Sequence, residues 1–169
     1  MKKVTLVEAP LSYGSPTRGA DQALNALVKG GLPGLFGENW NILTGPLREE
    51  APSKGWPPHL RDLDTVMQLV RQVYRLTHRA LTDGTFPIVI GGDHSCAMGS
   101  LAALGEFYGA ENLAVVYVDA HTDINTDQTS VTGYIHGMDL AAACGLCCEQ
   151  LDVGTQKVHL LGKNLRRAS

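Results

Sequence analysis

The chain has 169 residues, of which 44% are hydrophobic and 18% charged, a composition typical of a globular domain with its own core. Its net charge of −3 and its scattered lysines and arginines argue against a nucleic-acid-binding protein, which would need a basic face. The start MKKVTLVEAP has too short an apolar stretch for a signal peptide, and no run of about 20 apolar residues would span a membrane. We therefore expect a soluble, cytoplasmic protein that binds neither nucleic acid nor a membrane.

Strands and helices are predicted to alternate along the chain. Strands are expected where short β-branched and apolar runs occur, and helices where apolar residues recur every three or four positions. The predicted strands cover residues 3–7, 41–43, 86–90, 113–118 and 157–161. The predicted helices cover residues 20–28, 60–81, 95–107 and 138–147. This alternation favours an α/β fold in which helices cover both faces of a mainly parallel sheet, and no linker divides residues 1–169 into two domains.

The four cysteines raise the question of metal or redox chemistry. Cys144 and Cys147 have the C-x-x-C spacing that zinc sites and redox pairs use. A closed zinc site usually needs a second such pair, and the sequence contains none. We therefore interpret these cysteines as reduced side chains that pack as small hydrophobic groups in a helix.

Polar side chains follow two predicted strands at the points where these strands end. The sequence GGDHS occupies residues 91–95 and includes His94, and DAHTD occupies residues 119–123. In a parallel sheet both strands end at the same edge, where ligands bind. Residues i, i+2 and i+4 of an extended backbone point the same way, so the side chains of DAHTD are expected to converge, joined by His94.

Two imidazoles and two carboxylates form a ligand set that suits manganese and could also hold zinc or iron. A carboxylate bridging two metals about 3.5–4 Å apart would create a two-metal hydrolytic centre. The alternative interpretation is an ordinary loop, in which His94 bonds the backbone and the aspartates cap turns. The sequence contains no G-x-x-x-x-G-K, no G-x-G-x-x-G after the first strand and no G-x-S-x-G around Ser95.

Three segments in this order resemble the ureohydrolase family and, within it, the arginases. They are IGGDHS at residues 90–95, VDAHTDINT at 118–126 and IHGM at 135–138. Agmatinases share GGDH and DAHxD, whereas Asn125 favours the arginase branch. The resemblance implies an arginase-like three-layer α/β/α fold, of which this chain would be the N-terminal portion, with a sheet left incomplete on its C-terminal side.

The resemblance also implies a ligand set for two manganese ions. His94, Asp119 and Asp123 would bind one ion, while Asp119 and His121 would bind the second. Asp119 would therefore bridge the two metals. The expected reaction is hydrolysis of the L-arginine guanidinium group to L-ornithine and urea by a hydroxide that bridges the metals.

Further residues receive roles from the same resemblance. His136 would carry protons between solvent and the metals, because an imidazole titrates near neutrality, and Asp123 would be the other catalytic group. Three polar residues would bind the α-amino-acid end of arginine, the small-molecule substrate: Asn125, Ser130 and Thr132.

Several features depart from the family pattern. The family has a later D-x-D pair of metal ligands, and no D-x-D follows His136 in this sequence, so we expect the second metal site to be weak. Tyr134 stands where arginases usually have asparagine, and Asp139 where proline is common.

Several alternatives stay open. The chain is an arginase-type hydrolase whose activity needs compensation, for example by the homo-oligomers common in the family, or it is a truncated non-catalytic metal-binding relative. An agmatinase-like enzyme with another guanidino substrate and an unrelated zinc hydrolase are further alternatives.

Overall fold

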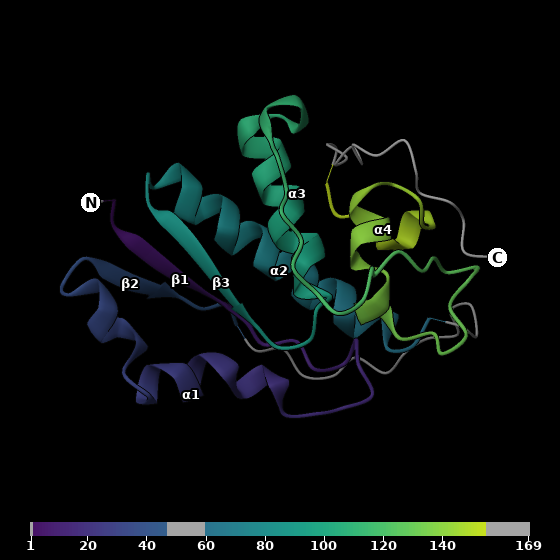
Figure 1. Ribbon diagram of the computed structural model, residues 1–169, viewed down its shortest axis with the longest axis horizontal. Helices are drawn as coiled ribbons and strands as arrows, with labels where there is room; N and C mark the ends of the chain where they lie inside the picture. Colours follow the sequence, from purple (N-terminus) through teal and green to yellow (C-terminus); the bar gives the residue numbers. More distant parts are fainter. Residues whose placement is uncertain (1, 47–59, 155–169) are drawn as a thin grey trace.

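A parallel sheet of three strands lies at the centre of the computed structural model, which describes residues 2–46 and 60–154 (Figure 1). β1 (Val4–Ala9) is the middle strand, with β2 (Trp40–Leu43) on one side and β3 (Phe86–Gly91) on the other. Both pairings are parallel, and the register places Ala9 opposite Gly91. The loops that follow β1 and β3 therefore leave the sheet at the same edge, as expected for a parallel α/β fold.

Helices cover both faces of this sheet, which confirms the predicted layers. α1 (Ala23–Lys29) lies below the sheet in Figure 1, and α2 (Leu63–Thr82) lies above it, with α3 (Cys96–Tyr108) packed against α2. One core forms between the sheet and α1 and includes Leu6, Leu24 and Ile90. A second core, larger than the first, forms around α2 and α3. The α/β class with a parallel sheet follows from this arrangement.

The apolar periodicity of residues 60–81 predicted the helix α2, because its apolar residues form one buried face. Val66, Val70 and Val73 lie on one stripe and are completely buried, while the charged residues of the helix point outward. Each buried valine contributes about 1.5–3 kcal/mol relative to an exposed one. Gly99 of α3 allows the close approach of the two helices, since a Cβ there would overlap the carbonyl oxygen of Val70.

The predicted helix over 138–147 is much shorter in the structure. α4 (Asp139–Ala143) ends because Gly145 takes a left-handed conformation with φ of 73°, which turns the chain away. Five 3-10 helices complete the described elements: Ala20–Gln22, Leu32–Phe36, Ala110–Asn112, Ile135–Gly137 and Glu149–Leu151. The predicted strand over 157–161 lies outside the described residues. No helix in the described ranges is both long and apolar enough to cross a membrane.

The prediction of a buried strand over 113–118 is wrong for this structure. Leu113 has extended backbone angles, but the segment forms no strand within the described residues, and Figure 1 draws it as coil. Val116 and Val118 are 88% and 91% exposed. The apolar run has strand propensity, yet a strand also needs a hydrogen-bonded neighbour, and the described part of the chain pairs none with it.

Candidate metal centre

The loops after β1 and β3 are joined by backbone hydrogen bonds at the edge of the sheet. The Gly92 amide donates to the Ala9 carbonyl at 3.1 Å, and the Asp93 amide donates to the Leu11 carbonyl at 2.8 Å. Leu11 is fully buried. These bonds hold the beginning of GGDHS directly against the chain that leaves β1, and they place His94 at this edge.

Asp93 fixes this junction through its buried carboxylate. Its Oδ2 accepts a hydrogen bond from the Gly14 amide at 2.9 Å, and its Oδ1 accepts one from the Ser95 amide at 3.0 Å. The Ser95 hydroxyl also donates to Oδ1. Three donors from two loops therefore converge on one carboxylate, which orients the backbone on either side of His94.

His94 lies at the centre of a group of polar side chains. Its Nδ1 lies 2.9 Å from Oδ2 of Asp123 and 3.1 Å from Oδ2 of Asp119. The Tyr117 hydroxyl lies 3.1 Å from the same nitrogen, and its ring stacks on the imidazole with centroids 5.2 Å apart. We call His94, Tyr117, Asp119, Asp123 and Asp139 the His94 cluster.

Asp123 reaches this cluster through an unusual backbone conformation. Its φ of 47° is in the left-handed region, which a non-glycine residue rarely adopts, and its side chain is buried. Its carbonyl accepts a hydrogen bond from the Ala141 amide of α4 at 3.2 Å. The turn at Asp123 and the start of α4 therefore hold each other in place, and strain of this kind is common at functional sites.

Asp139, the first residue of α4, supplies a second buried carboxylate. It has no exposed surface, and its Oδ2 accepts a hydrogen bond from the Tyr117 hydroxyl at 2.9 Å. Its Oδ1 is buried and has no hydrogen-bond partner among the described residues. Burial raises the pKa of Asp139 to about 8, and the nearby carboxylate of Asp123 acts in the same direction.

The other ionisable groups of the His94 cluster respond to the same surroundings. Burial raises the pKa of Tyr117 strongly, and the carboxylates of Asp139 and Asp123 raise it further, so this hydroxyl keeps its proton. The amide of His121 donates to Oδ1 of Asp119 at 2.7 Å and lowers the pKa of that carboxyl. Asp119 and Asp123 are thus held close together beside one imidazole.

The expectation that the three polar residues of DAHTD converge in an extended backbone is correct only for the two aspartates. The backbone bends at Ala120 and His121, so the His121 side chain is 84% exposed. Its Nδ1 lies 3.7 Å from Oδ1 of Asp119, which is close enough for an ion pair but away from His94. The structure therefore brings His94, Asp119 and Asp123 together and leaves His121 at the rim.

The remaining predicted site residues lie in the segment that precedes α4. The His136 amide donates to the Gly14 carbonyl at 3.0 Å, and the Asn125 amide donates to the Gly137 carbonyl at 3.2 Å. The Ser130 hydroxyl accepts from the Gly133 amide and the Thr132 hydroxyl from the Tyr134 amide, so both stabilise turns of this loop. The bond from His136 to Gly14 ties this segment to the loop after β1.

Two members of the cluster, Tyr117 and Asp139, were not predicted as site residues. Tyr117 was assigned to a buried strand, although a hydroxyl within the apolar run AVVYV is a signal that this position faces a polar partner. The sequence marks Asp139 only as a departure from a family pattern. Its contact with Tyr117 spans 22 positions of the chain, and no local spacing could have indicated it.

The chain is similar in sequence to proteins of one known family. The family model of the arginase family matches residues 2–162, which is nearly the whole chain. The chain belongs to the arginase family. Arginase of Bacillus caldovelox is 34% identical over 150 residues, which cover 86% of this chain and 50% of that protein.

Solved structures agree with this family membership. The crystal structure of arginase from Bacillus cereus has a TM-score of 0.79 and 30% identity, covering 93% of this chain and 54% of that one. Entamoeba histolytica arginase in complex with L-ornithine has a TM-score of 0.78 and 28% identity, covering 93% and 55%. This chain spans about half the length of the arginases it matches, and the likeness confirms the arginase-like fold class.

The donor set of this arginase-family chain fits a divalent metal ion. The ligand atoms of His94, Asp123 and Asp139 lie within 4.8 Å of one another, and one imidazole with carboxylates suits manganese, zinc or iron. Further support comes from Oδ1 of Asp139, a buried carboxylate oxygen without a hydrogen-bond donor among the described residues. Such an oxygen destabilises the fold unless a proton or a cation binds it.

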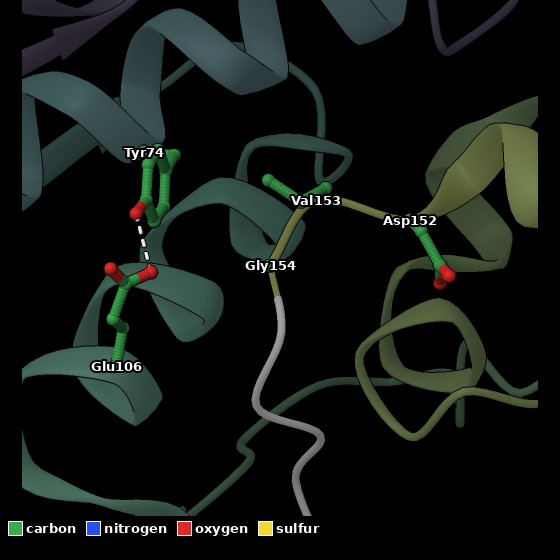
Figure 2. A pocket seen from close by; sticks show the side chains of 5 residues that line it. All are labelled: Tyr74, Glu106, Asp152, Val153 and Gly154. Carbon is green, nitrogen blue, oxygen red and sulfur yellow. Dashed lines mark hydrogen bonds between the residues drawn. The ribbon is translucent and has the colours of Figure 1, made fainter.

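Figure 2 shows a hollow elsewhere on the surface. It is lined by Tyr74, Glu106, Asp152, Val153 and Gly154, and the Tyr74 hydroxyl donates to the Glu106 carboxylate. None of these residues belongs to the His94 cluster.

The cysteines are all free thiols, and we predict that they react slowly in the native chain. Burial raises the pKa of Cys96 and of Cys147 to about 12. Alkylation needs the thiolate, so at pH 7.5 iodoacetamide should modify Cys147 about 10³ times more slowly than an exposed cysteine. Mass spectrometry of the native chain and of a urea-unfolded control would measure the two rates. Rapid labelling of Cys147 in the native chain, or a Cys144–Cys147 disulfide, would instead indicate redox chemistry.

Proposed function

We propose that this chain carries the metal-binding part of an arginase-type ureohydrolase site, whose reaction is manganese-dependent hydrolysis of L-arginine to L-ornithine and urea. Family membership supports the hydrolase class. The observation that carries the proposal is the convergence of Asp119 and Asp123 on Nδ1 of His94, at 3.1 and 2.9 Å. Two loops that are far apart in the sequence are held in this contact by the Asp93 network and by α4.

We assign the first manganese ion to His94, Asp119 and Asp123, and the second to Asp119 and His121. A metal bound there would activate water for attack on the guanidinium carbon. The exposed side chain of His121 makes the second site the weaker of the two. The carboxylates have a further function, since a cationic guanidinium could not approach two divalent metals without negative charge to offset them.

We assign roles to the polar residues of the segment before α4 from their positions relative to this centre. We assign proton transfer to His136, because its backbone is bonded to the loop after β1 and an imidazole side chain can both accept and donate a proton. We assign recognition of the α-amino-acid end of arginine to Asn125, Ser130 and Thr132. Asn125 is exposed and is tied by its amide to Gly137, directly after His136. This backbone bond supports the assignment, because it holds Asn125 close in space to the residue that follows the proposed proton carrier.

The experiment that tests this proposal measures metal and urea together. The full chain is loaded with Mn²⁺, freed of unbound metal, and assayed for bound manganese and for urea released from L-arginine or agmatine. His94→Ala is expected to weaken Mn²⁺ binding by about 100-fold or more, because it removes the ligand at the centre of the set. His78→Ala, which alters a partly exposed histidine on α2 that contacts Phe107, is the matched control.

The outcomes separate the proposal from its alternatives. Manganese-dependent urea release from arginine that His94→Ala abolishes supports an arginase-type site. Release from agmatine alone would replace the substrate assignment. Equal Mn²⁺ binding by the wild type, His94→Ala and His78→Ala would overturn the metal assignment. Bound manganese without urea would indicate a metal-binding relative that does not catalyse the reaction on its own.

A further inference from the structure

We propose that Asp139 is a further protein ligand of the metal held by His94 and Asp123, with Tyr117 as the residue that positions its carboxylate. The inference rests on the proposed metal centre and deepens it. It adds a carboxylate from α4 to a ligand set otherwise drawn from the loops after β3 and after residue 118.

The first observation is the environment of the Asp139 side chain. It is completely buried, and a buried polar group destabilises the fold unless its atoms have partners. Oδ2 has one, the Tyr117 hydroxyl at 2.9 Å, whereas Oδ1 has none among the described residues. The carboxylate lies within 4.8 Å of the ligand atoms of His94 and Asp123. A buried carboxylate that has one oxygen without a donor and lies close to two other ligand groups is the arrangement that a bound cation would complete.

The second observation is that the His94 cluster has few hydrogen-bond donors and few basic side chains for its three carboxylates. The hydroxyl of Tyr117 lies within 3.1 Å of His94 Nδ1, Asp123 Oδ2 and Asp139 Oδ2, but it has a single proton to donate. No lysine or arginine within residues 2–46 and 60–154 pairs with any of the three carboxylates. One imidazole, one hydroxyl and the His121 amide offer too few donors for all the oxygens of three carboxylates, and a divalent cation would satisfy the oxygens that remain.

The third observation is that a backbone hydrogen bond fixes the position of Asp139 relative to Asp123. The amide of Ala141 donates to the carbonyl of Asp123, so the first turn of α4 is bonded to the strained turn that presents the Asp123 carboxylate. Met138 and Ala142 anchor α4 in the core around α2. The two carboxylates are therefore fixed relative to each other before any metal binds, which favours binding because little ordering is left to do.

The test compares Mn²⁺ binding by the full chain with that by Asp139→Asn, using electron paramagnetic resonance of free Mn²⁺. Asparagine keeps the shape of the side chain but binds the metal more weakly, so we expect affinity to fall at least tenfold. Asp83→Asn removes one negative charge from an exposed aspartate and is the matched control. Thermal unfolding of each chain is measured with and without Mn²⁺, because a metal that binds only the folded state raises the melting temperature.

A ligand role and a purely structural role give different results. For a ligand, Asp139→Asn melts at the same or a higher temperature than the wild type without metal, and it loses the stabilisation by Mn²⁺. For a structural residue, the variant melts lower without metal and retains wild-type affinity, which overturns the inference.

The same experiment separates this inference from the proposed function. Tight Mn²⁺ binding that depends on Asp139, without urea release, upholds the ligand and removes the catalytic proposal. Both chains are also assayed for urea released from L-arginine, and urea release with equal metal binding by the wild type and Asp139→Asn removes the ligand only. A wild-type chain that binds no Mn²⁺ overturns both.

Discussion

Gly92→Ala is expected to destabilise the chain strongly. A Cβ at Gly92 would overlap the carbonyl oxygen of Leu11, which is backbone and fully buried. The chain after β1 would have to move, and the bonds from Gly92 to Ala9 and from Asp93 to Leu11 would break. We expect the free energy of unfolding to fall by about 3 kcal/mol or more. Urea unfolding followed by circular dichroism measures this loss.

A matched variant at another glycine controls for the added methyl group. At Gly34 a Cβ would meet no heavy atom within 4 Å, and its φ is not in the left-handed region. Gly34→Ala should therefore leave stability unchanged or raise it by about 0.4–1 kcal/mol, because the unfolded chain loses freedom. If Gly92→Ala and Gly34→Ala unfold at the same urea concentration, the close contact between the loops after β1 and β3 is not present in solution.

Asp93→Ala is expected to cost about 3 kcal/mol of stability and to weaken metal binding by about 10–100-fold. The substitution leaves the amides of Gly14 and Ser95 and the Ser95 hydroxyl without their acceptor, and Ser95 is completely buried. Each buried donor without an acceptor costs about 1–3 kcal/mol. His94 follows Asp93 directly, so its imidazole loses the fixed backbone that aims it at Asp119 and Asp123.

The control for this variant is Asp83→Ala, which removes an exposed carboxylate paired with Arg79 at 3.7 Å. Exposed pairs contribute little, so stability should change by less than about 1 kcal/mol and Mn²⁺ affinity should stay the same. Asp93→Ala with wild-type stability would mean that water replaces the carboxylate as the acceptor. Lower stability with unchanged Mn²⁺ affinity would mean that the network supports the fold without orienting His94.

Local patterns predicted most of the described elements because each pattern reports a property of its own segment. The apolar stripe of α2 is complete within the segment that forms the helix, and Gly84, with φ of 71°, follows its end as expected. The apolar run of β3 predicted a strand to within one residue. Residues 113–118 have the same kind of run and form no strand, because pairing depends on a neighbour that the run does not contain.

The candidate site was predictable in its motifs and only partly in its geometry. His94, Asp119 and Asp123 converge as their positions after two apolar runs suggested, although the second run is not a strand. The alternating spacing failed for His121, because it assumes an extended backbone and the chain bends there.

The amino-acid sequence alone indicates the class of the protein, an α/β chain of the arginase family with histidines and aspartates after short apolar runs. Local periodicity and short motifs indicate these features, because neither depends on contacts between distant segments. Only the tertiary structure decided which donors meet. The left-handed turn at Asp123, the bend before His121 and the docking of α4 bring Asp139 and Tyr117 to His94. Such contacts depend on how distant segments pack, and packing is a property of the whole fold.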